Sequence, residues 1–284
     1  MNRGIDIGGT FIKAGVVNNG NIIKKISIPT EVSKGRERVI RNIMTCIAEF
    51  CDKTTKEIGI GCPGSIDHKS GIVISSTNLP IAGINFPKII KKKFNLLARI
   101  DNDANCFALA EFKYGAGKGR NNMIGITMGT GIGSGVIINE ELYIGRNMAA
   151  ELGHIIIKYD GELCNCGKKG HLEAYIGTKG IQRLFGKKIS PEEIFKLAAK
   201  GNNKALKTWE SVGNYLGVGI TNMIHAYDPD IVVIGGSVSN AWRFFSESMI
   251  DTVEKLSLFQ KTKIVKAKLA DAGIIGAAEL LKKE

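Results

Sequence analysis

The sequence predicts an α/β protein built from two similar domains that face a shared cleft. Two glycine-rich turns support this prediction: Gly8-Gly9-Thr10 and Gly129-Thr130-Gly131 begin 121 residues apart, and each follows an apolar strand segment. The same offset relates Asn18 to Asn139, so a polar turn repeats as well. Strands alternate with helices along the chain, as α/β architecture requires.

Each repeat starts with three strands joined by tight turns, expected at 3–7, 13–17 and 21–26 and again at 123–127, 135–138 and 141–144. Further strands are expected at 57–64, 96–100 and 230–236, each ending in a glycine loop or an acidic segment. Apolar residues at helical spacing predict helices at 35–53, 190–201, 204–227, 241–259 and 271–281. Ser190 and Glu193 form a capping-box pattern, and we expect Asp271 to cap the last helix.

The composition is that of an ordinary globular protein, with 44% hydrophobic and 23% charged residues in 284. No apolar run reaches the roughly 18–20 residues that span a bilayer, and a strand begins at residue 3, so we expect a cytoplasmic protein without membrane contact. The net charge of +12 favours a lysine-rich solvated surface. The run at 91–93 has few aromatic or arginine neighbours, which argues against nucleic-acid binding.

Six motifs in order show a resemblance that covers nearly the whole chain: Asp6-Ile-Gly-Gly-Thr10, Gly61-Cys-Pro-Gly64, Asn102-Asp-Ala-Asn105, Gly129-Thr-Gly-Ile-Gly133, Glu151-Leu-Gly-His154 and Cys164-Asn-Cys-Gly-Lys-Lys-Gly-His171-Leu-Glu173. The chain resembles the ROK family of sugar kinases and repressors, within the actin-like ATPase superfamily. The resemblance implies two ribonuclease-H-like domains that flank a cleft. The first domain would consist of residues 1–107 and 271–284, and the second, larger domain would consist of residues 108–270 and carry a zinc-binding loop. The chain would cross between them near 104–111 and before residue 271, and the domains would close on sugar.

The acidic segment 101–105 follows a strand and opens a helix. Carboxylates at a helix start are often caps, but this segment has more acid and amide groups than capping requires. The resemblance assigns Asp103 as the general base that accepts a sugar hydroxyl proton during attack on the γ-phosphorus. It also assigns sugar binding to Asn102.

Further sugar-binding residues follow from the resemblance: Gly64, Asn78, Glu151, His154 and Glu173. Carboxylates suit this role because each accepts two hydroxyl protons. After Pro80 the chain lacks the Gly-Trp pair that the family often has, so this region does not indicate the sugar.

The glycine turns expose backbone N–H groups that can bind phosphate, although such turns also occur as simple hairpins. The expected nucleotide-binding residues are Asp6, Gly8, Gly9, Thr10 and Lys13 from the first repeat and Gly129, Thr130 and Gly131 from the second. The resemblance adds Gly235 and Gly236, which could instead form a tight turn after a buried strand. Asp6 would reach a phosphate-bound Mg²⁺ through water.

His154, Cys164, Cys166 and His171 form a plausible tetrahedral set for structural zinc. The family usually has a third cysteine where this chain has His171, so His171 could instead point away. The other four cysteines fit buried or cleft-lining positions. His68 and His225 belong to no motif and are interpreted as structural or surface residues.

The motifs and the resemblance together imply an ATP-dependent hexose kinase that phosphorylates a sugar 6-hydroxyl, with ATP, Mg²⁺ and structural Zn²⁺. Glucose is the first expectation, and N-acetylmannosamine, N-acetylglucosamine, mannose and fructose stay open. A homodimer or homotetramer is expected. A sugar-responsive transcriptional regulator is disfavoured because no helix-turn-helix precedes the first strand. A catalytically silent sugar-binding protein is disfavoured because Asp6 and Asp103 are both present.

Overall fold

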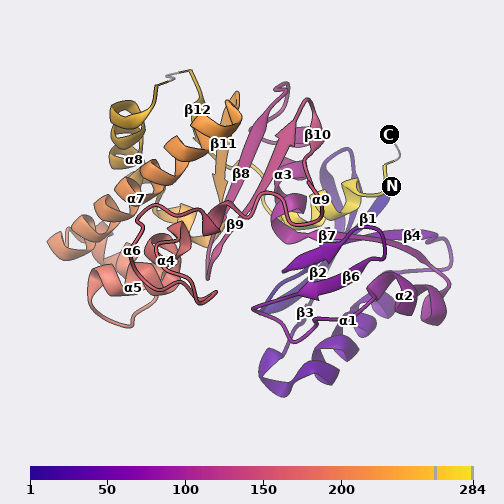
Figure 1. Ribbon diagram of the computed structural model, residues 1–284. Helices are drawn as coiled ribbons and strands as arrows, with labels where there is room; N and C mark the ends of the chain where they lie inside the picture. Colours follow the sequence, from indigo (N-terminus) through magenta and orange to yellow (C-terminus); the bar gives the residue numbers. More distant parts are fainter. Residues whose placement is uncertain (259–260, 283–284) are drawn as a thin grey trace.

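A five-stranded mixed sheet forms the first lobe of the computed structural model, which describes residues 1–258 and 261–282 (Figure 1). The strand order is β3-β2-β1-β4-β7, in which β1 to β3 are antiparallel and β1, β4 and β7 are parallel. The strands are β1 (Asn2–Ile7), β2 (Phe11–Asn18), β3 (Asn21–Pro29), β4 (Glu57–Cys62) and β7 (Leu97–Asn102). Helices α1 (Arg36–Phe50) and α2 (Phe86–Phe94) complete its core, and a hairpin of β5 (Ser65–Asp67) and β6 (Ile72–Ser75) follows β4.

The second lobe repeats this arrangement, with the strand order β10-β9-β8-β11-β12. Its strands are β8 (Met123–Met128), β9 (Ile132–Ile138), β10 (Glu141–Leu142), β11 (Ile231–Gly235) and β12 (Lys263–Lys266). Its helices are α4 (Leu172–Ile176), α5 (Thr178–Phe185), α6 (Pro191–Ala199), α7 (Asn203–Tyr227) and α8 (Trp242–Leu256). Short 3₁₀ helices span Val32–Lys34, Leu152–His154 and Ser237–Ala241. The shared strand order and directions confirm the predicted α/β repeat.

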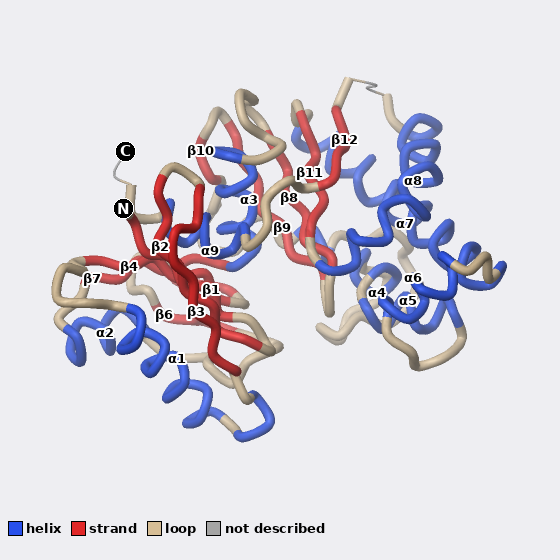
Figure 2. The backbone as a smooth tube through the Cα atoms, turned by 180° about the vertical axis from the view of Figure 1, so that it is seen from behind, coloured by secondary structure: helices blue, strands red, loops and turns tan. Residues whose placement is uncertain are grey.

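Two helices lie between the sheets and connect the lobes, as Figures 1 and 2 show from opposite sides. Helix α3 (Asp103–Tyr114) packs on β8 and β9, whereas α9 (Ala272–Glu279) packs on β1, β2 and β4. The two helices also pack against each other. Their approach is close: a Cβ atom on Gly276 would lie 1.7 Å from the carbonyl oxygen of Cys106, so this position requires glycine.

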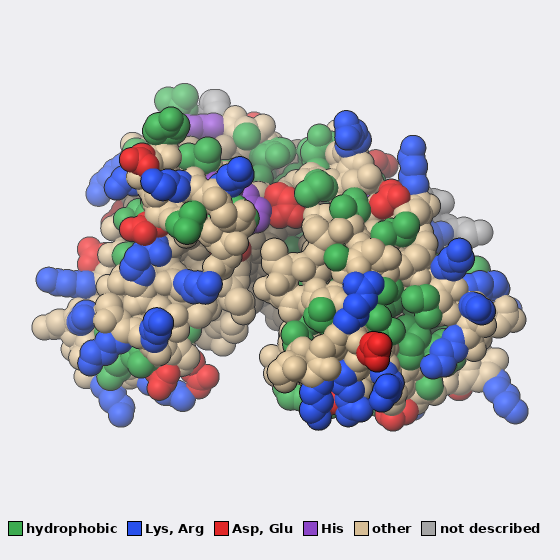
Figure 3. Space-filling model, turned by 60° about the horizontal axis from the view of Figure 1, so that its bottom comes forward, with side chains coloured by type: hydrophobic (Ala, Val, Ile, Leu, Met, Phe, Trp, Pro, Cys, Tyr) green, Lys and Arg blue, Asp and Glu red, His purple; other side chains and the backbone are tan. Residues whose placement is uncertain are grey.

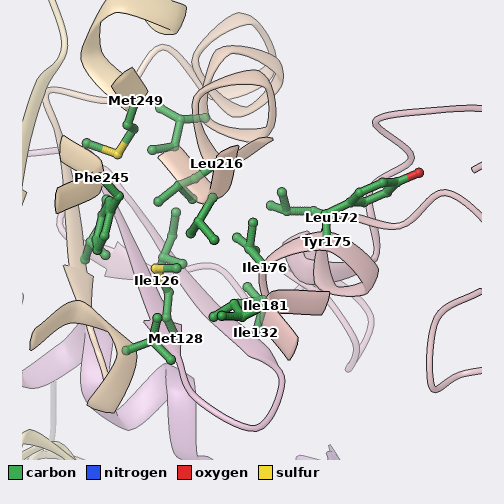
Figure 4. Close-up of a cluster of buried hydrophobic side chains, with 14 of the residues drawn as sticks. Ile126, Met128, Ile132, Leu172, Tyr175, Ile176, Ile181, Leu216, Phe245 and Met249 are labelled. Carbon is green, nitrogen blue, oxygen red and sulfur yellow. The ribbon is translucent and has the colours of Figure 1, made fainter. Parts of the chain in front are cut away.

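The largest core cluster lies in the second lobe, between its sheet and helices α4 to α8. Figure 4 shows how Ile126 and Met128 of β8 face Leu216 of α7, Ile176 of α4 and Phe245 of α8. Trp209 and Phe245 are fully buried in this cluster. Because each large side chain removed from water contributes about 1.5–3 kcal/mol, this core provides a rigid support for the loops at the strand ends.

The expected helices all form, with small differences at their ends. The capping box is confirmed, since Ser190 Oγ accepts the N–H of Glu193 and the Glu193 carboxylate accepts the N–H of Ser190. The helix expected at 241–259 ends at Leu256, and residue 259 lies outside the described residues. The shorter elements α2, α4, α5, β5, β6 and β12 were not individually predicted.

The predicted capping role of Asp271 is wrong. Asp271 stands at the N-cap position of α9, but within the described chain its side chain makes no capping hydrogen bond. Its carboxylate oxygens instead accept hydrogen bonds from Lys13 Nζ (3.1 Å) and Lys25 Nζ (2.6 Å) of the neighbouring strands. Two ammonium groups compete better for this carboxylate than the backbone N–H groups of the helix do.

Charged side chains are spread over both lobes. Figure 3 shows Lys and Arg scattered over the visible face rather than gathered in one tract. Among residues 1–258 and 261–282, no helix is both long and apolar enough to cross a lipid bilayer.

The fold predicts that Glu111→Gln is strongly destabilising. Glu111 of α3 is fully buried, and its carboxylate accepts backbone N–H groups of Lys268 (3.0 Å), Leu269 (2.7 Å) and Ala116 (2.8 Å). A glutamine would turn an N–H₂ group toward one of these donors and leave it buried without a partner. We expect the free energy of unfolding to fall by about 2–4 kcal/mol in urea denaturation. Exposed Glu49→Gln serves as the control, and equal urea midpoints for both variants would contradict this role.

Candidate active site

A cavity of about 440 Å³ lies in the cleft between the lobes. The first lobe and α3 contribute Asp6, Lys13 and Asp103, and the second lobe contributes Thr127, Gly235 and Gly236. The segment 266–273, which leads into α9, closes one side and adds Lys266 and Lys268. Acidic side chains and a histidine are visible in the hollow between the lobes in Figure 3. The structure thus brings the predicted base and part of the predicted nucleotide site into one cavity.

The start of α3 holds Asp103 at this cavity. The Oδ1 atom of Asn102 accepts the N–H groups of Ala104 (2.8 Å) and Asn105 (3.2 Å), which caps the helix. The Nδ2 atom of Asn102 donates to the carbonyl oxygen of Gly64 (3.0 Å), which joins the helix start to the β4–β5 loop. Removal of Asp103 from water raises the pKa of its carboxyl group, which strengthens it as a proton acceptor.

Asp6 lies at the end of β1, opposite Lys13 in the antiparallel pair β1–β2. Burial, followed by the charge of Asp103, raises the pKa of Asp6 to about 6. Because Asp6 and Asp103 repel each other when both are ionised, a cation placed between phosphate and Asp6 would lower the energy of the charged site.

The two predicted phosphate turns lie at the corresponding strand ends. Gly8, Gly9 and Thr10 connect β1 to β2, and Gly9 and Thr10 are exposed. Gly129, Thr130 and Gly131 connect β8 to β9, where Gly129 N–H bonds the carbonyl oxygen of Gly131 (3.0 Å). Beside the second turn, a cavity of about 510 Å³ is lined by Thr130, Phe195 and Trp209 among others.

A smaller cavity of about 30 Å³ lies beside the start of α3. It is lined by three predicted sugar-binding residues, Gly64, Asn102 and Glu151, and also by His68 and Asn147. His68 and Asn147 were missed by the sequence reasoning, because neither belongs to a motif and their importance depends on contacts across the cleft. Asn78 is exposed and lines neither of these cleft cavities.

Glu173 connects three parts of the second lobe. Its Oε2 atom accepts the N–H of Ile132 (3.0 Å), just after the phosphate turn, and its Oε1 atom accepts from the thiol of Cys164 (3.3 Å). A Cβ atom on Gly131 would lie 2.3 Å from Glu173 Oε2, so a larger residue there would push the Glu173 carboxylate aside. Glu151 lies 4.0 Å from His154 Nε2, and desolvation raises its pKa.

His154, Cys164, Cys166 and His171 bring two imidazoles and two thiols together. Their candidate ligand atoms lie within 4.8 Å of one another. Cys166 Sγ lies 3.2 Å from His171 Nδ1, and Cys164 Sγ lies 3.8 Å from His154 Nδ1, so His171 points toward the cluster. Burial raises the pKa of the Cys164 thiol to about 12, so a free Cys164 keeps its proton and a bound metal ion would displace it. The donor set fits a tetrahedral N₂S₂ metal site.

Two five-stranded sheets of the same order, joined by a helix pair and facing a cleft, define the actin-like ATPase fold, which confirms the predicted fold class. The family model for ROK proteins matches residues 2–284. The chain belongs to the ROK family, as its motifs predict.

Three known proteins show how far the similarity extends. The chain is 34% identical to a glucokinase from Thermotoga maritima, over 98% of this chain and 96% of that protein. It is 33% identical to an N-acetyl-D-glucosamine kinase from Photobacterium profundum, over 99% of both chains. A crystal structure of a ROK family glucokinase from Streptomyces griseus in complex with glucose and AMPPNP matches with a TM-score of 0.86 and 29% identity, over 98% of both chains.

The raised pKa of Asp6 predicts a pH-dependent effect of Asp6→Asn without nucleotide or Mg²⁺. Between pH 3.8 and about 6 the folded protein keeps a proton that the unfolded chain releases, so the contribution of Asp6 to stability falls as the pH rises through this window. Above about pH 6 the ionised carboxylate destabilises the fold, and Asp6→Asn should be more stable than the wild type by about 3 kcal/mol.

This difference should disappear below about pH 4, where Asp6 is protonated in both states. Thermal midpoints measured from pH 3.5 to 8 would show it, with exposed Asp251→Asn of α8 as the matched control. A constant difference across this range would contradict the assigned pKa.

Proposed function

We propose that this protein is an ATP-dependent sugar kinase that transfers the γ-phosphoryl group of ATP to the 6-hydroxyl of a hexose. One observation carries the proposal: Asp103 and Asp6 line one cleft cavity together with Gly235 and Gly236 of the opposite lobe. A proton acceptor, a carboxylate able to hold a phosphate-bound cation and glycine backbone that phosphate can approach closely are groups suited to phosphoryl transfer. Family membership and the kinases among the relatives support it.

Asp103 acts as the general base in this proposal. Its carboxylate accepts the proton of the sugar hydroxyl as that oxygen attacks the γ-phosphorus, and ADP leaves on the opposite side. The raised pKa favours this proton transfer, and Asp103 Oδ1 accepts the N–H of Ala104 (3.0 Å), which helps to hold the side chain at the helix start. Closure of the lobes would exclude water and so favour the sugar over hydrolysis.

Sugar hydroxyls would be bound by Asn102, Glu151, Glu173 and His154, with the loop at Gly64 closing one side. Glu151 and Glu173 can each accept two hydroxyl protons. Asn78 is part of the proposed sugar site as well, although it is exposed here and would have to approach when the lobes close. Glucose is the proposed sugar, and N-acetylglucosamine or N-acetylmannosamine is the alternative.

The nucleotide would lie across the cleft, with its phosphates near Gly8, Gly9, Thr10 and Lys13 on one side and the Gly129–Thr130–Gly131 turn on the other. The apolar side of the adjacent cavity, with Pro191 and Phe195, suits the base of the nucleotide. Mg²⁺ would be held near Asp6 through water and would neutralise charge on the transferred phosphoryl group. The proposal includes two domains, one formed by residues 1–107 and 271–284 and the other by residues 108–270. It also includes assembly into a homodimer or homotetramer.

A structural Zn²⁺ ion at His154, Cys164, Cys166 and His171 would hold the loop between Glu151 and Glu173. All four positions would be filled by protein, so the ion itself would have no open position for substrate. Its effect on the sugar would be indirect, because its proposed ligand His171 directly precedes helix α4, which carries Glu173.

A sugar-responsive regulator is the less favoured function. A regulator must bind sugar, but it needs no proton acceptor at a phosphate cavity. Asp103, with its raised pKa beside Asp6, favours the enzyme.

Sugar-dependent ADP release tests the proposed function. In a coupled assay with glucose, mannose, fructose, N-acetylglucosamine and N-acetylmannosamine, we expect turnover with at least one sugar, highest with glucose. Asp103→Asn should lower kcat by about 10²–10⁴-fold and leave sugar affinity nearly intact, since the base acts on the reacting hydroxyl. Asp251→Asn is the control. Wild-type turnover in Asp103→Asn would remove Asp103 from this role.

Elemental analysis tests the zinc site. We expect one zinc per chain, with Zn–S near roughly 2.3 Å and Zn–N near roughly 2.0–2.1 Å by X-ray absorption. The double variant Cys164→Ser and Cys166→Ser should lose the metal, lower the thermal midpoint and raise the KM for sugar, because Glu173 loses its support. Cys51→Ser, outside the cluster, should change none of these. Metal-free wild-type protein with full stability would refute the site.

A further inference from the structure

His68 lies between the two lobes, beside the start of α3. It follows β5 and lines the small cavity that also contains Asn102 and Glu151. Its side chain is only 19% exposed. A histidine in this position is costly to desolvate unless it has partners, so its contacts indicate what it does.

On the first lobe, His68 bonds the carboxylate that ends β7. His68 Nε2 lies 3.1 Å from Asp101 Oδ1, and the Asp101 side chain is 6% exposed. The same oxygen accepts the N–H of Asn102 (2.6 Å) and Nδ2 of Asn105 (2.8 Å). Asp101 Oδ1 therefore accepts three hydrogen bonds, and of these three donors only His68 lies outside the segment 101–105.

This network bears directly on Asn102 and Asp103. Asn102 caps α3, and its backbone N–H is held by Asp101, so the direction of Asp101 determines how the helix start is oriented. The hydrogen bond to Asp101, and to a lesser extent the neighbouring Asn147, raises the pKa of His68, which favours the charged imidazole and a stronger bond. The acidic groups that act on the imidazole are Asp101 and Asp67.

On the second lobe, His68 contacts the segment that leads to Glu151. The backbone N–H of His68 donates to Asn147 Oδ1 at 3.4 Å. In the described part of the chain, the Nδ1 atom of His68 is buried and has no hydrogen bond of good geometry. Only the short stretch 148–150 separates Asn147 from Glu151.

We propose that His68 is a positioning residue for phosphoryl transfer, which fixes Asp101 and thereby the Asn102–Asp103 helix start, and which connects that start to the Asn147 segment before Glu151. The inference rests on the proposed function. His68 takes no part in proton transfer to the sugar. It acts through Asp101, and a small misplacement of a reacting group lowers the rate strongly.

Kinetics of His68→Ala and His68→Gln test this role, with exposed Lys69→Ala as the neighbouring control. His68→Ala should lower kcat by about 10–100-fold, with the KM for ATP unchanged, at temperatures far below its thermal midpoint. His68→Gln should restore part of kcat, because its amide N–H can donate to Asp101. Asn147→Ala should raise the KM for sugar by about threefold or more while changing kcat less, since it removes the contact from the second lobe.

Three results would overturn the inference. The first is wild-type kcat in His68→Ala, and the second is an equal loss in the alanine and glutamine variants that follows their loss of thermal stability. The third, a wild-type sugar KM in Asn147→Ala, would remove the connection to Glu151. If the wild-type protein releases no ADP with any sugar, the proposed function itself fails and the inference falls with it, which is a different and recognisable outcome.

Discussion

The close packing of α3 against α9 is the contact on which the rest of the structure depends. Each helix covers a different sheet, so the two lobes meet through this pair. The cluster of buried residues around it includes Val17 of the first lobe, Ala108 of α3, Val233 of the second lobe and Ile275 of α9. Gly276 permits the approach, because any side chain there would strike the backbone of α3. Asp103 begins the same helix, so the packing that joins the lobes also places the proposed base.

A second constraint connects the loops of the second lobe. Glu173 accepts bonds from the phosphate-turn side at Ile132 and from the metal cluster at Cys164. A change at the metal cluster therefore reaches both the proposed sugar site and the proposed phosphate turn through one carboxylate. Glu173 lies in the first turn of α4, so the short helix and these two bonds together hold its carboxylate in a defined direction.

Much of the fold could be predicted from sequence, because it resides in local patterns. The three-strand repeats and helices such as α7 have long periodic segments and clear turns. The capping box is recognisable from the four residues between Ser190 and Glu193. Short elements such as the β5–β6 hairpin carry too few residues for a periodic signal. Asp271 was misassigned since the lysines that bind its carboxylate lie on strands distant in the sequence.

The candidate site was predictable to the extent that motifs mark it. Asp103, Glu151 and the Cys/His cluster each belong to a short pattern with a chemical purpose. His68 has no such pattern, and its importance arises from a bond to Asp101 that only the folded chain creates. Asn78 shows the opposite case: a motif singles it out, yet its place in this structure is exposed and away from the cleft cavities.

The two lobes share one strand order, but they present different residues to the cleft at equivalent positions. If the two lobes were exact copies, they would present the same residue to the cleft from both sides. Under the 121-residue offset, Asp6 corresponds to Thr127, and both line the same cavity. One lobe carries a carboxylate at this position, and the other carries a neutral hydroxyl. The repeated strand order of the scaffold is therefore not matched by the charges that line the cleft, and these charges give the cleft a polarity that the backbone alone does not have.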